Sequence, residues 1–583
     1  MRSHRSHRLA CLALLLSSAG GCGGHSSKPA DARGALESRR DPSSAAGITA
    51  DGQVMLRHYI DAAELPDLQW PSFSHYQSEV REFYDAFPSE LPWVRGGKPT
   101  AQALAIIAAL KNAEYKGLRP EDYDGPRWDA RLAQIGQSQA GSESGLVRFD
   151  LALTVSAMRY ISDLYIGRVN PRSFSFDLEI DHAKLDLSEF LRKEIVNASN
   201  TDTALESAEP PFPVYHRTEA ALKTYIELVR KDDGELLPIP SQTVKPGDPY
   251  PGVSQLAKRL SLVGDIPGDA GQTGEAYEGA LVDGVKHFQE RHGLEPTGLI
   301  DRLTLRELNT PLGHRVNQLR LTMERIRWLP HEFARPPIVV NIPDFRLYAV
   351  DETFHRVFSM RVVLGRAYKH QTPVFASEIR SVIFRPYWDV PSSIVKEEFL
   401  LHLDEDPNYL AENSYQVVDK HGTVVTEGLV DERTKDQLRA GFLRIRQVPG
   451  PDNALGLLKF DIPSSYDVYM HGTPATALFS RSRRDFSHGC IRVENPVKLA
   501  EWVLRDMPEW DEEKIRAAME GDVTFGVKLT KPLPVLIFYS TSVVMENGDV
   551  HFFDDIYGHD SALERVLDEG YPYREGAELP AGQ

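Results

Sequence analysis

The sequence contains very few cysteines: among 583 residues there are only Cys11, Cys22 and Cys490. Three thiols cannot build the disulfide framework that holds many small secreted domains together. Beyond the N-terminus no run of 18 uninterrupted apolar residues occurs, so the sequence predicts no transmembrane helix there. Cations are also in the minority, with 66 Lys and Arg against 84 Asp and Glu and a formal net charge of −18. This balance argues against a nucleic-acid partner, because nucleic-acid affinity depends on neutralising phosphates.

The composition that remains is that of a soluble globular protein, with 41% hydrophobic and 26% charged residues. The chain is too long for a single hydrophobic core, so we expect about three globular units.

The N-terminus is typical of an export signal. Three arginines within the first eight residues precede a short apolar run at 9–16, and the small residues at 19–21 stand directly before Cys22. We therefore interpret residues 1–21 as a signal peptide. A cysteine after small residues resembles a bacterial lipoprotein lipobox, in which Cys22 is lipidated, although Ala19 departs from the usual leucine. The alternative is an ordinary secretory signal cleaved nearby.

This interpretation leaves one free thiol in the mature chain. Cys11 is removed with the signal peptide, and Cys22 carries the lipid, so only Cys490 remains. A single unpaired thiol in an exported protein indicates a reactive site, and the alternative is a buried, inert cysteine.

The residues that follow the predicted signal peptide divide into a tether and a helical region. Residues 22–50 are rich in Ser, Ala, Gly and Pro and are predicted to be a flexible tether. Residues 51–245 carry mainly helical periodicity, including a helix that Thr100 caps, with Leu104, Ile107 and Ala108 on its apolar face. No chemistry-bearing pattern occurs there, so we interpret this region as a structural scaffold.

A compact unit follows at 250–312, and its pattern predicts three short helices. Leu281, Val285 and Phe288 lie on one helical face, and Gly293 ends that helix. The unit resembles the peptidoglycan-binding domain of bacterial wall hydrolases at Gln255-Leu256, Phe288-Gln289, His292-Gly293-Leu294, Thr297-Gly298, Ile300-Asp301 and Leu308-Asn309. The alternative is a module that only packs against its neighbours.

Residues 313–568 begin with a helix and continue as strand-like runs bounded by Pro, Gly and Asp. A charged, partly helical stretch at about 392–445 interrupts these strands and is a candidate lid over a cleft. Residues 569–583 are predicted to be a loose tail.

The stretch YMHGTPATALFSRSRRDFSHGCIRVENP, residues 469–496, carries the candidate chemistry. Cys490 follows Gly489, which allows close approach of a substrate carbonyl, and His471 and His488 are both candidate bases. Backbone N–H groups around Gly489 and Cys490 are candidate donors to an oxyanion. A zinc site formed by His471, His488 and Cys490 is the competing interpretation, but the spacing fits no structural zinc pattern and no fourth ligand is evident.

The same residues resemble the motif of L,D-transpeptidases, in which a His precedes Ser/Thr-His-Gly-Cys, an apolar residue, and Asn or Arg. Fifteen residues separate His471 from the segment Ser487-His488-Gly489-Cys490-Ile491-Arg492. The resemblance implies that Cys490 is the nucleophile and His471 the base. It implies that Arg492 shapes the site, and that Ser487, His488 and Gly489 support the loop or the oxyanion hole. Tyr469, two residues before His471, is expected to line the substrate pocket, the alternative being a core aromatic.

The resemblance extends over nearly the whole mature chain and is to the large Gram-negative class of these enzymes. Five further segments carry it in the same order: KGLRPEDYD (116–124), RYISDLYIGRVNP (159–171), PYWDVP (386–391), QVPGPDNALG (447–456) and DDIYGHD (554–560). The implied fold is multidomain α+β: a helical scaffold, a small three-helix peptidoglycan-binding domain and a β-rich YkuD-type catalytic domain with a lid.

The resemblance also implies a reaction: 3→3 cross-linking of two peptidoglycan tetrapeptide stems, donor and acceptor, through a Cys490 thioester with release of D-Ala. No metal or organic cofactor is implied. The expected location is the cell envelope facing the periplasm, anchored through Cys22, with the outer membrane favoured by analogy because Gly23 replaces an Asp retention signal. The alternatives are a cysteine carboxypeptidase or endopeptidase of the wall, and a non-catalytic wall-binding lipoprotein.

Overall fold

The computed structural model describes residues 47–137, 142–178, 185–268 and 274–573. The predicted signal peptide, Cys22 and nearly all of the predicted tether lie outside these residues. Within the described ranges, no helix has the length and apolar character needed to cross a bilayer.

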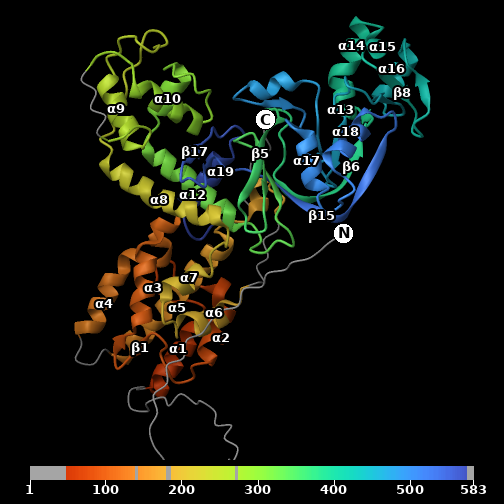
Figure 1. Ribbon diagram of the computed structural model, residues 1–583. Coiled ribbons are helices and arrows are strands. Elements are labelled where there is room, and N and C mark those ends of the chain that lie inside the picture. The colour runs from red at the N-terminus through yellow and green to blue at the C-terminus, as the bar shows by residue number, and fades with distance from the viewer. Residues whose placement is uncertain (1–46, 138–141, 179–184, 269–273, 574–583) are drawn as a thin grey trace, which may run out of the picture. The chain divides into compact units, whose positions relative to one another are not determined.

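The N-terminal part is helical, as the sequence predicts, and its elements form the red-to-yellow group in Figure 1. Its centre is α5, whose residues from Phe149 to Ile161 are all buried. Helix α5 spans Glu143–Ile166, and the other helices of this part are α1 (Ala50–Ala62), α2 (Gln77–Asp85), α3 (Ala101–Lys111), α4 (Trp128–Gln137), α6 (Leu187–Phe190), α7 (Thr201–Glu206) and α8 (Pro213–Lys231).

Helix α3 confirms the predicted cap but corrects the predicted face. The Thr100 side chain accepts a hydrogen bond from the backbone N–H of Ala103, as expected for an N-cap. Leu104 is 47% exposed and Ala108 is also exposed, whereas the buried face consists of Ala103, Ile106, Ile107 and Leu110. The helix is apolar almost all round, so its periodicity does not identify the buried side.

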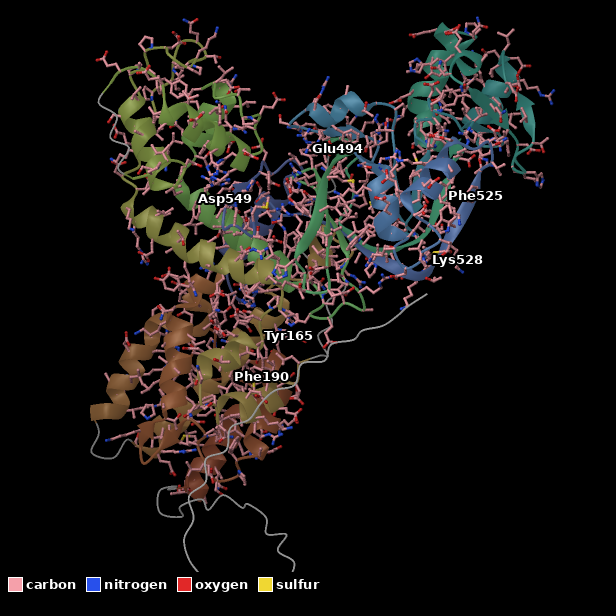
Figure 2. All side chains as sticks on the ribbon, viewed as in Figure 1. Tyr165, Phe190, Glu494, Phe525, Lys528 and Asp549 are labelled. Carbon is pink, nitrogen blue, oxygen red and sulfur yellow. The ribbon has the colours of Figure 1, made fainter. Side chains whose placement is uncertain are left out.

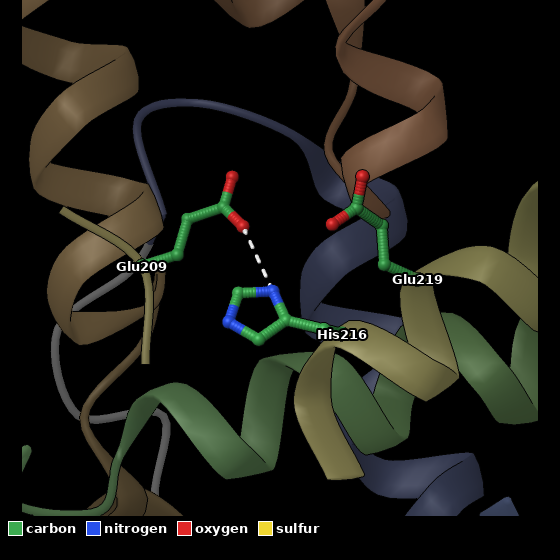
Figure 3. Close-up of side chains that lie close together, drawn as sticks. All are labelled: Glu209, His216 and Glu219. Atoms are coloured by element: carbon green, nitrogen blue, oxygen red, sulfur yellow. Dashed lines mark ion pairs between the residues drawn. The ribbon is translucent and has the colours of Figure 1, made fainter. Parts of the chain in front are cut away.

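A buried ion network links the scaffold turn at Lys116 to α8. The Lys116 ammonium lies 2.5 Å from Glu209 and 2.9 Å from Glu219. Figure 3 shows Glu209, Glu219 and the intervening His216, whose ring is 3.9 Å from Glu209. These two carboxylates raise the pKa of Lys116 against the opposing effect of burial, so the network already contains its own cation.

The three predicted helices of the small module are present as α9 (Val253–Leu262), α10 (Ala280–Arg291) and α11 (Arg302–Leu308). Leu281, Val285 and Phe288 face its core together, as predicted. Helix α12 (Leu312–Arg327) then leads into the strands and packs against α8.

The C-terminal part is built on a nine-stranded sheet of order β13-β5-β14-β12-β11-β6-β15-β3-β4. Strand β4 also pairs with β5, so the sheet closes on itself. Its strands are β3 (Ile338–Asn341), β4 (Arg346–Val350), β5 (Arg356–Gly365), β6 (Phe375–Phe384), β11 (Leu458–Asp461), β12 (Met470–His471), β13 (Asp485–Ser487), β14 (Ile491–Val493) and β15 (Phe525–Phe538). Helices α17 (Pro496–Val503), α18 (Glu512–Glu520) and α19 (His559–Glu569) and the hairpin β16 (Ser542–Val544) and β17 (Val550–Phe552) complete it.

The predicted lid region is more ordered than its sequence suggests. It contains a second sheet, β7-β10-β8-β9, and a separate hydrophobic core that includes Phe399, Leu410 and Ile445. Its elements, mainly teal in Figure 1, are β7 (Trp388–Asp389), α13 (Ser392–Ile394), α14 (Leu400–Glu405), α15 (Tyr409–Glu412), β8 (Tyr415–Val418), β9 (Val424–Thr426), α16 (Glu432–Arg439) and β10 (Arg444–Gln447). Charged residues are interspersed among the apolar ones in this segment, so its sequence pattern does not predict the small apolar core.

The start of the predicted tail also differs from expectation. The Tyr573 hydroxyl donates to Asp122 of the scaffold, and the Arg159 guanidinium lies 4.6 Å from the Tyr571 ring centroid. Two aromatic rings therefore dock this segment, while residues 574–583 lie outside the described part of the chain.

Candidate active site

Adjacent parallel strands bring the predicted nucleophile and base together. Met470 pairs with Ile491 and His471 with Arg492, and the Ile491 N–H donates to the Tyr469 carbonyl at 3.0 Å. Cys490 therefore lies beside Tyr469 at the entrance to β14. Since alternate residues face the same side of a strand, Cys490, Tyr469, His471 and Arg492 share one face.

His471 is held as a neutral imidazole. Its side chain is buried, and Nδ1 lies 2.5 Å from the Gly472 carbonyl, which can only accept a hydrogen bond, so Nδ1 carries the proton. Burial, helped by the positive charges of Arg492 and Lys459, lowers the pKa of His471 to about 3. Nε2 is consequently free of a proton and available as a base.

Cys490 is held as a thiol. Burial raises its pKa above the ordinary value of 9.0, and this effect outweighs hydrogen bonding from Tyr469 and the charges of Lys459 and Arg492. The resting pair is therefore a thiol and a neutral imidazole rather than a thiolate and an imidazolium. A thiol in this state requires a base to form the attacking thiolate.

Tyr469 lies inside the site rather than in the domain core. Its ring centroid is 5.7 Å from that of His471, and the Lys459 ammonium lies 4.0 Å from the Tyr469 ring centroid. Burial and the neighbouring Cys490 raise the pKa of the Tyr469 hydroxyl, which therefore remains a hydrogen-bond donor. Arg492 is half-buried on the same face, and burial lowers its pKa.

The turn before Cys490 depends on glycine and on the Ser487 hydroxyl. Gly489 has φ +111°, a conformation that L side chains rarely adopt. Ser487 Oγ donates to the Cys490 carbonyl at 2.6 Å and accepts from the Gly489 N–H at 3.1 Å. The Gly489 N–H is therefore hydrogen-bonded within the turn, and its role as an oxyanion donor stays a prediction. The Cys490 N–H has no hydrogen-bond partner among the described residues and remains the candidate donor.

Two residues that support this turn were missed from the sequence. Thr372 Oγ1 donates to the Gly489 carbonyl at 2.9 Å and accepts from the Gly365 N–H at 2.9 Å. The Tyr557 hydroxyl donates to the Gly365 carbonyl at 2.7 Å. Thr372 is 117 residues from Gly489, and Tyr557 is 192 residues from Gly365, so local spacing predicts neither contact. The DDIYGHD resemblance included Tyr557, whereas no sequence signal indicated Thr372.

His488 faces the lid rather than serving as the partner of the thiol. Its Nε2 lies 2.8 Å from Glu398, and its ring centroid is 4.7 Å from that of His370. The neighbouring Glu397 pairs with Lys369 at 2.9 Å and with His370 at 3.3 Å. This His–Glu latch ties the lid to the nucleophile turn. Among the described residues, the ligand atoms of His471, His488 and Cys490 do not form a group within 4.8 Å of one another.

The fold and site define a multidomain α+β protein whose closed β-sheet carries a cysteine beside a neutral histidine. Residues 335–537 match the YkuD L,D-transpeptidase catalytic domain, residues 249–308 a "Putative peptidoglycan binding domain", and residues 78–222 a "Scaffold domain". The family resemblance and fold class predicted from the sequence are thus confirmed.

A curated relative, "Putative L,D-transpeptidase" of Haemophilus influenzae, is 34% identical over 247 residues. The alignment covers 42% of this chain and 48% of the relative, so the chain spans about half the length of the curated relative it matches.

Proposed function

We propose that this protein is a cysteine-dependent L,D-transpeptidase that forms 3→3 cross-links between peptidoglycan stems. The observation that carries the proposal is that Cys490 and neutral His471 lie on one face of two adjacent strands in the matched catalytic domain. Cys22 lipidation, and a location in the envelope facing the periplasm, belong to the same proposal and rest on the sequence alone.

In the first half-reaction, His471 Nε2 takes the Cys490 proton as sulfur attacks the carbonyl between the third residue and the terminal D-Ala. The N–H of Cys490 donates to the oxygen as it becomes negative. Collapse of the tetrahedral intermediate breaks the amide bond, and the leaving D-Ala amine takes the proton from His471. The products are a Cys490 thioester and free D-Ala.

In the second half-reaction, the side-chain amine of a diaminopimelate on another stem attacks the thioester. His471 accepts the amine proton and returns it to the leaving Cys490 sulfur, so no net proton is gained or lost. The low pKa of resting His471 is compatible with this role, because negative charge on the adjacent sulfur favours imidazolium formation as the thiolate develops. The latched lid supports amine attack by limiting access of water.

The decisive experiment compares the full chain with Cys490→Ala on purified tetrapeptide-bearing wall fragments. We expect D-Ala release and cross-linked dimers from the unaltered protein and neither from the variant, with equal thermal unfolding temperatures. Dimers formed by Cys490→Ala contradict the proposal. Trimmed monomers without dimers from the unaltered protein instead support the cysteine hydrolase. Failure of a thiol-reactive carbapenem to modify Cys490 supports a non-catalytic binder.

A further inference from the structure

A basic groove lies on the catalytic domain, away from the Cys490 pair. It has a volume of about 1030 Å³, and its catalytic-domain wall carries Arg346, Arg356, Arg361, Arg481, Arg483 and Arg484. The facing wall comes from the peptidoglycan-binding module and the β16–β17 hairpin, where Asp549 is labelled in Figure 2. The lining also carries carboxylates, so the cationic character is local to the catalytic-domain wall; these carboxylates are Glu290, Glu295, Asp344, Glu546, Asp549 and Asp554.

Two of these arginines face each other across a strand pair, and Asp344 lies 3.8 Å from one of them, Arg346. Arg346 and Arg361 are directly opposite one another on β4 and β5, and like charges in that position destabilise a sheet. Beneath them, the buried Arg484 guanidinium donates to backbone carbonyls, among them Val362 at 3.2 Å and Phe345 at 3.0 Å. Burial, with Arg346 and Arg361 nearby, lowers the pKa of Arg484 to about 10.

Three of the arginines also lack a carboxylate partner. Within the part of the chain that the structure describes, no carboxylate oxygen lies within 4.0 Å of a side-chain nitrogen of Arg356, Arg361 or Arg481. Glu494, labelled in Figure 2, accepts the backbone N–H of Arg361 rather than its side chain. The buried Arg168, by contrast, pairs with Glu324 at 3.0 Å. Arg361 instead donates to the Phe479 carbonyl at 3.1 Å, and the Arg481 guanidinium lies 5.2 Å from the Phe486 ring centroid, so no described carboxylate neutralises their charges.

The position of the groove matches an extended ligand of the active site. Strand β5 pairs with β14 with Arg492 opposite Val363, and extending this antiparallel register by two residues brings Cys490 level with Gly365, which itself pairs with Ser487 of β13. Arg361 is four residues along β5 on the same face, about 13 Å away at 3.3 Å per residue. A four-residue extended peptide spans about the same distance. Guanidinium groups bind carboxylates through paired N–H donors.

We propose that this groove binds the carboxylates of an extended acidic peptide, which for this enzyme is a peptidoglycan stem. Arg361 and Arg481 are the principal contacts, because both are exposed and neither has a carboxylate partner among the described residues. The identity of the peptide rests on the proposed function, whereas recognition of its carboxylates rests on the arginine wall itself.

The test measures peptide binding without turnover. In a full-length Cys490→Ala background, the affinity of a fluorescently labelled stem tetrapeptide is compared with that of the same peptide with its carboxylates amidated. We expect the acidic peptide to bind at least about tenfold more tightly. Arg361→Gln/Arg481→Gln abolishes that preference, whereas Arg57→Gln/Arg81→Gln, which alters two partly exposed scaffold arginines, preserves it.

Equal binding of the acidic and amidated peptides, or an unchanged preference in Arg361→Gln/Arg481→Gln, overturns the inference. So does stronger displacement of the labelled peptide by inorganic phosphate or phosphatidylglycerol vesicles than by unlabelled stem, since the groove then prefers phosphate. Failure of the groove inference can be distinguished from failure of the proposed function. Loss of the carboxylate preference with intact Cys490-dependent cross-linking rejects only the groove, while retained preference without cross-linking rejects only the reaction.

Discussion

His471 owes its state to burial and a backbone carbonyl rather than to a carboxylate partner. Gly472 fixes the Nδ1 tautomer, and the apolar surroundings keep the ring neutral. Enzymes with a Cys–His pair often rest as a thiolate and an imidazolium, which requires an environment that stabilises charge. Here burial opposes both charges, so in the proposed reaction proton transfer accompanies attack on the substrate carbonyl.

This predicts an unusual dependence on pH for the first half-reaction. The base is lost only when His471 is protonated, and its pKa of about 3 lies below the ordinary 6.5. The single-turnover rate of thioester formation should therefore change less than about twofold between pH 7 and pH 5. Quenched-flow mass spectrometry of the acyl-enzyme measures this rate. An acid limb near pH 6.5 that persists in His488→Gln contradicts the assignment, and His471→Gln should abolish acylation.

A second residue-level prediction concerns the turn before the nucleophile. Gly489→Ala places a Cβ at φ +111°, with a strain of about 1–3 kcal/mol. Relief of that strain rotates the peptide that orients Cys490, so we expect acylation to fall at least about 100-fold. Gly234→Ala is the matched control, because Gly234 has φ +72° and open space around it. Equal acylation rates in the two variants would show that the turn is not critical.

At the scale of elements, local sequence patterns were sufficient to predict a helix or strand where its apolar residues have a clear periodicity. The three helices around Leu281 and Phe288 and the strands from Ile338 onward were predictable because burial follows sequence spacing there. Helix α3 was oriented wrongly because nearly all its residues are apolar. Cys490 and His471 were found from one motif, whereas Thr372 and Glu398 reach the site through long-range contacts that spacing does not encode.

The lid latch provides an element-level prediction. Glu398→Gln removes the negative charge that pairs with His488 and contacts Arg366 at 3.8 Å. A loosened lid admits water, so we expect the ratio of hydrolysed stems to cross-linked dimers to rise by about threefold or more. Mass spectrometry of the two products gives that ratio. Glu432→Gln is the control, because Glu432 lies in the lid but pairs with Lys435 instead. A ratio that rises equally in both variants points to general destabilisation of the lid.

At the scale of the whole molecule, a buried ion pair joins the scaffold to the helix that precedes the catalytic sheet. Glu324 on α12 accepts the backbone N–H of Arg168 at 2.5 Å and pairs with the Arg168 side chain at 3.0 Å. Both side chains are almost completely buried, and Arg327 lies 3.6 Å from the same carboxylate. Arg168 belongs to the RYISDLYIGRVNP segment, so the physical role of that family-like segment is structural.

Removal of one partner of the Arg168–Glu324 pair should therefore destabilise the protein strongly. Glu324→Ala leaves the Arg168 guanidinium buried without its counter-charge, which we expect to lower the free energy of unfolding by about 3–5 kcal/mol. Denaturant titration measures the loss. Glu227→Ala breaks an exposed pair with Arg230, so it should cost only about 0–1 kcal/mol. Comparable losses in the two variants would mean that the buried pair does not hold these parts together.

The contact between Tyr557 and Gly365 has a consequence for how such chains diversify. The catalytic-domain match ends at residue 537, but the hydroxyl that braces the Gly365–Thr372 turn beneath Gly489 comes from residue 557. A recombination event at the end of the matched domain would transmit Cys490 and His471 without this brace. The segment that must be inherited together is therefore longer than the matched span of residues 335–537. We expect recombination among relatives to keep the segment through α19 together with the strands that precede it.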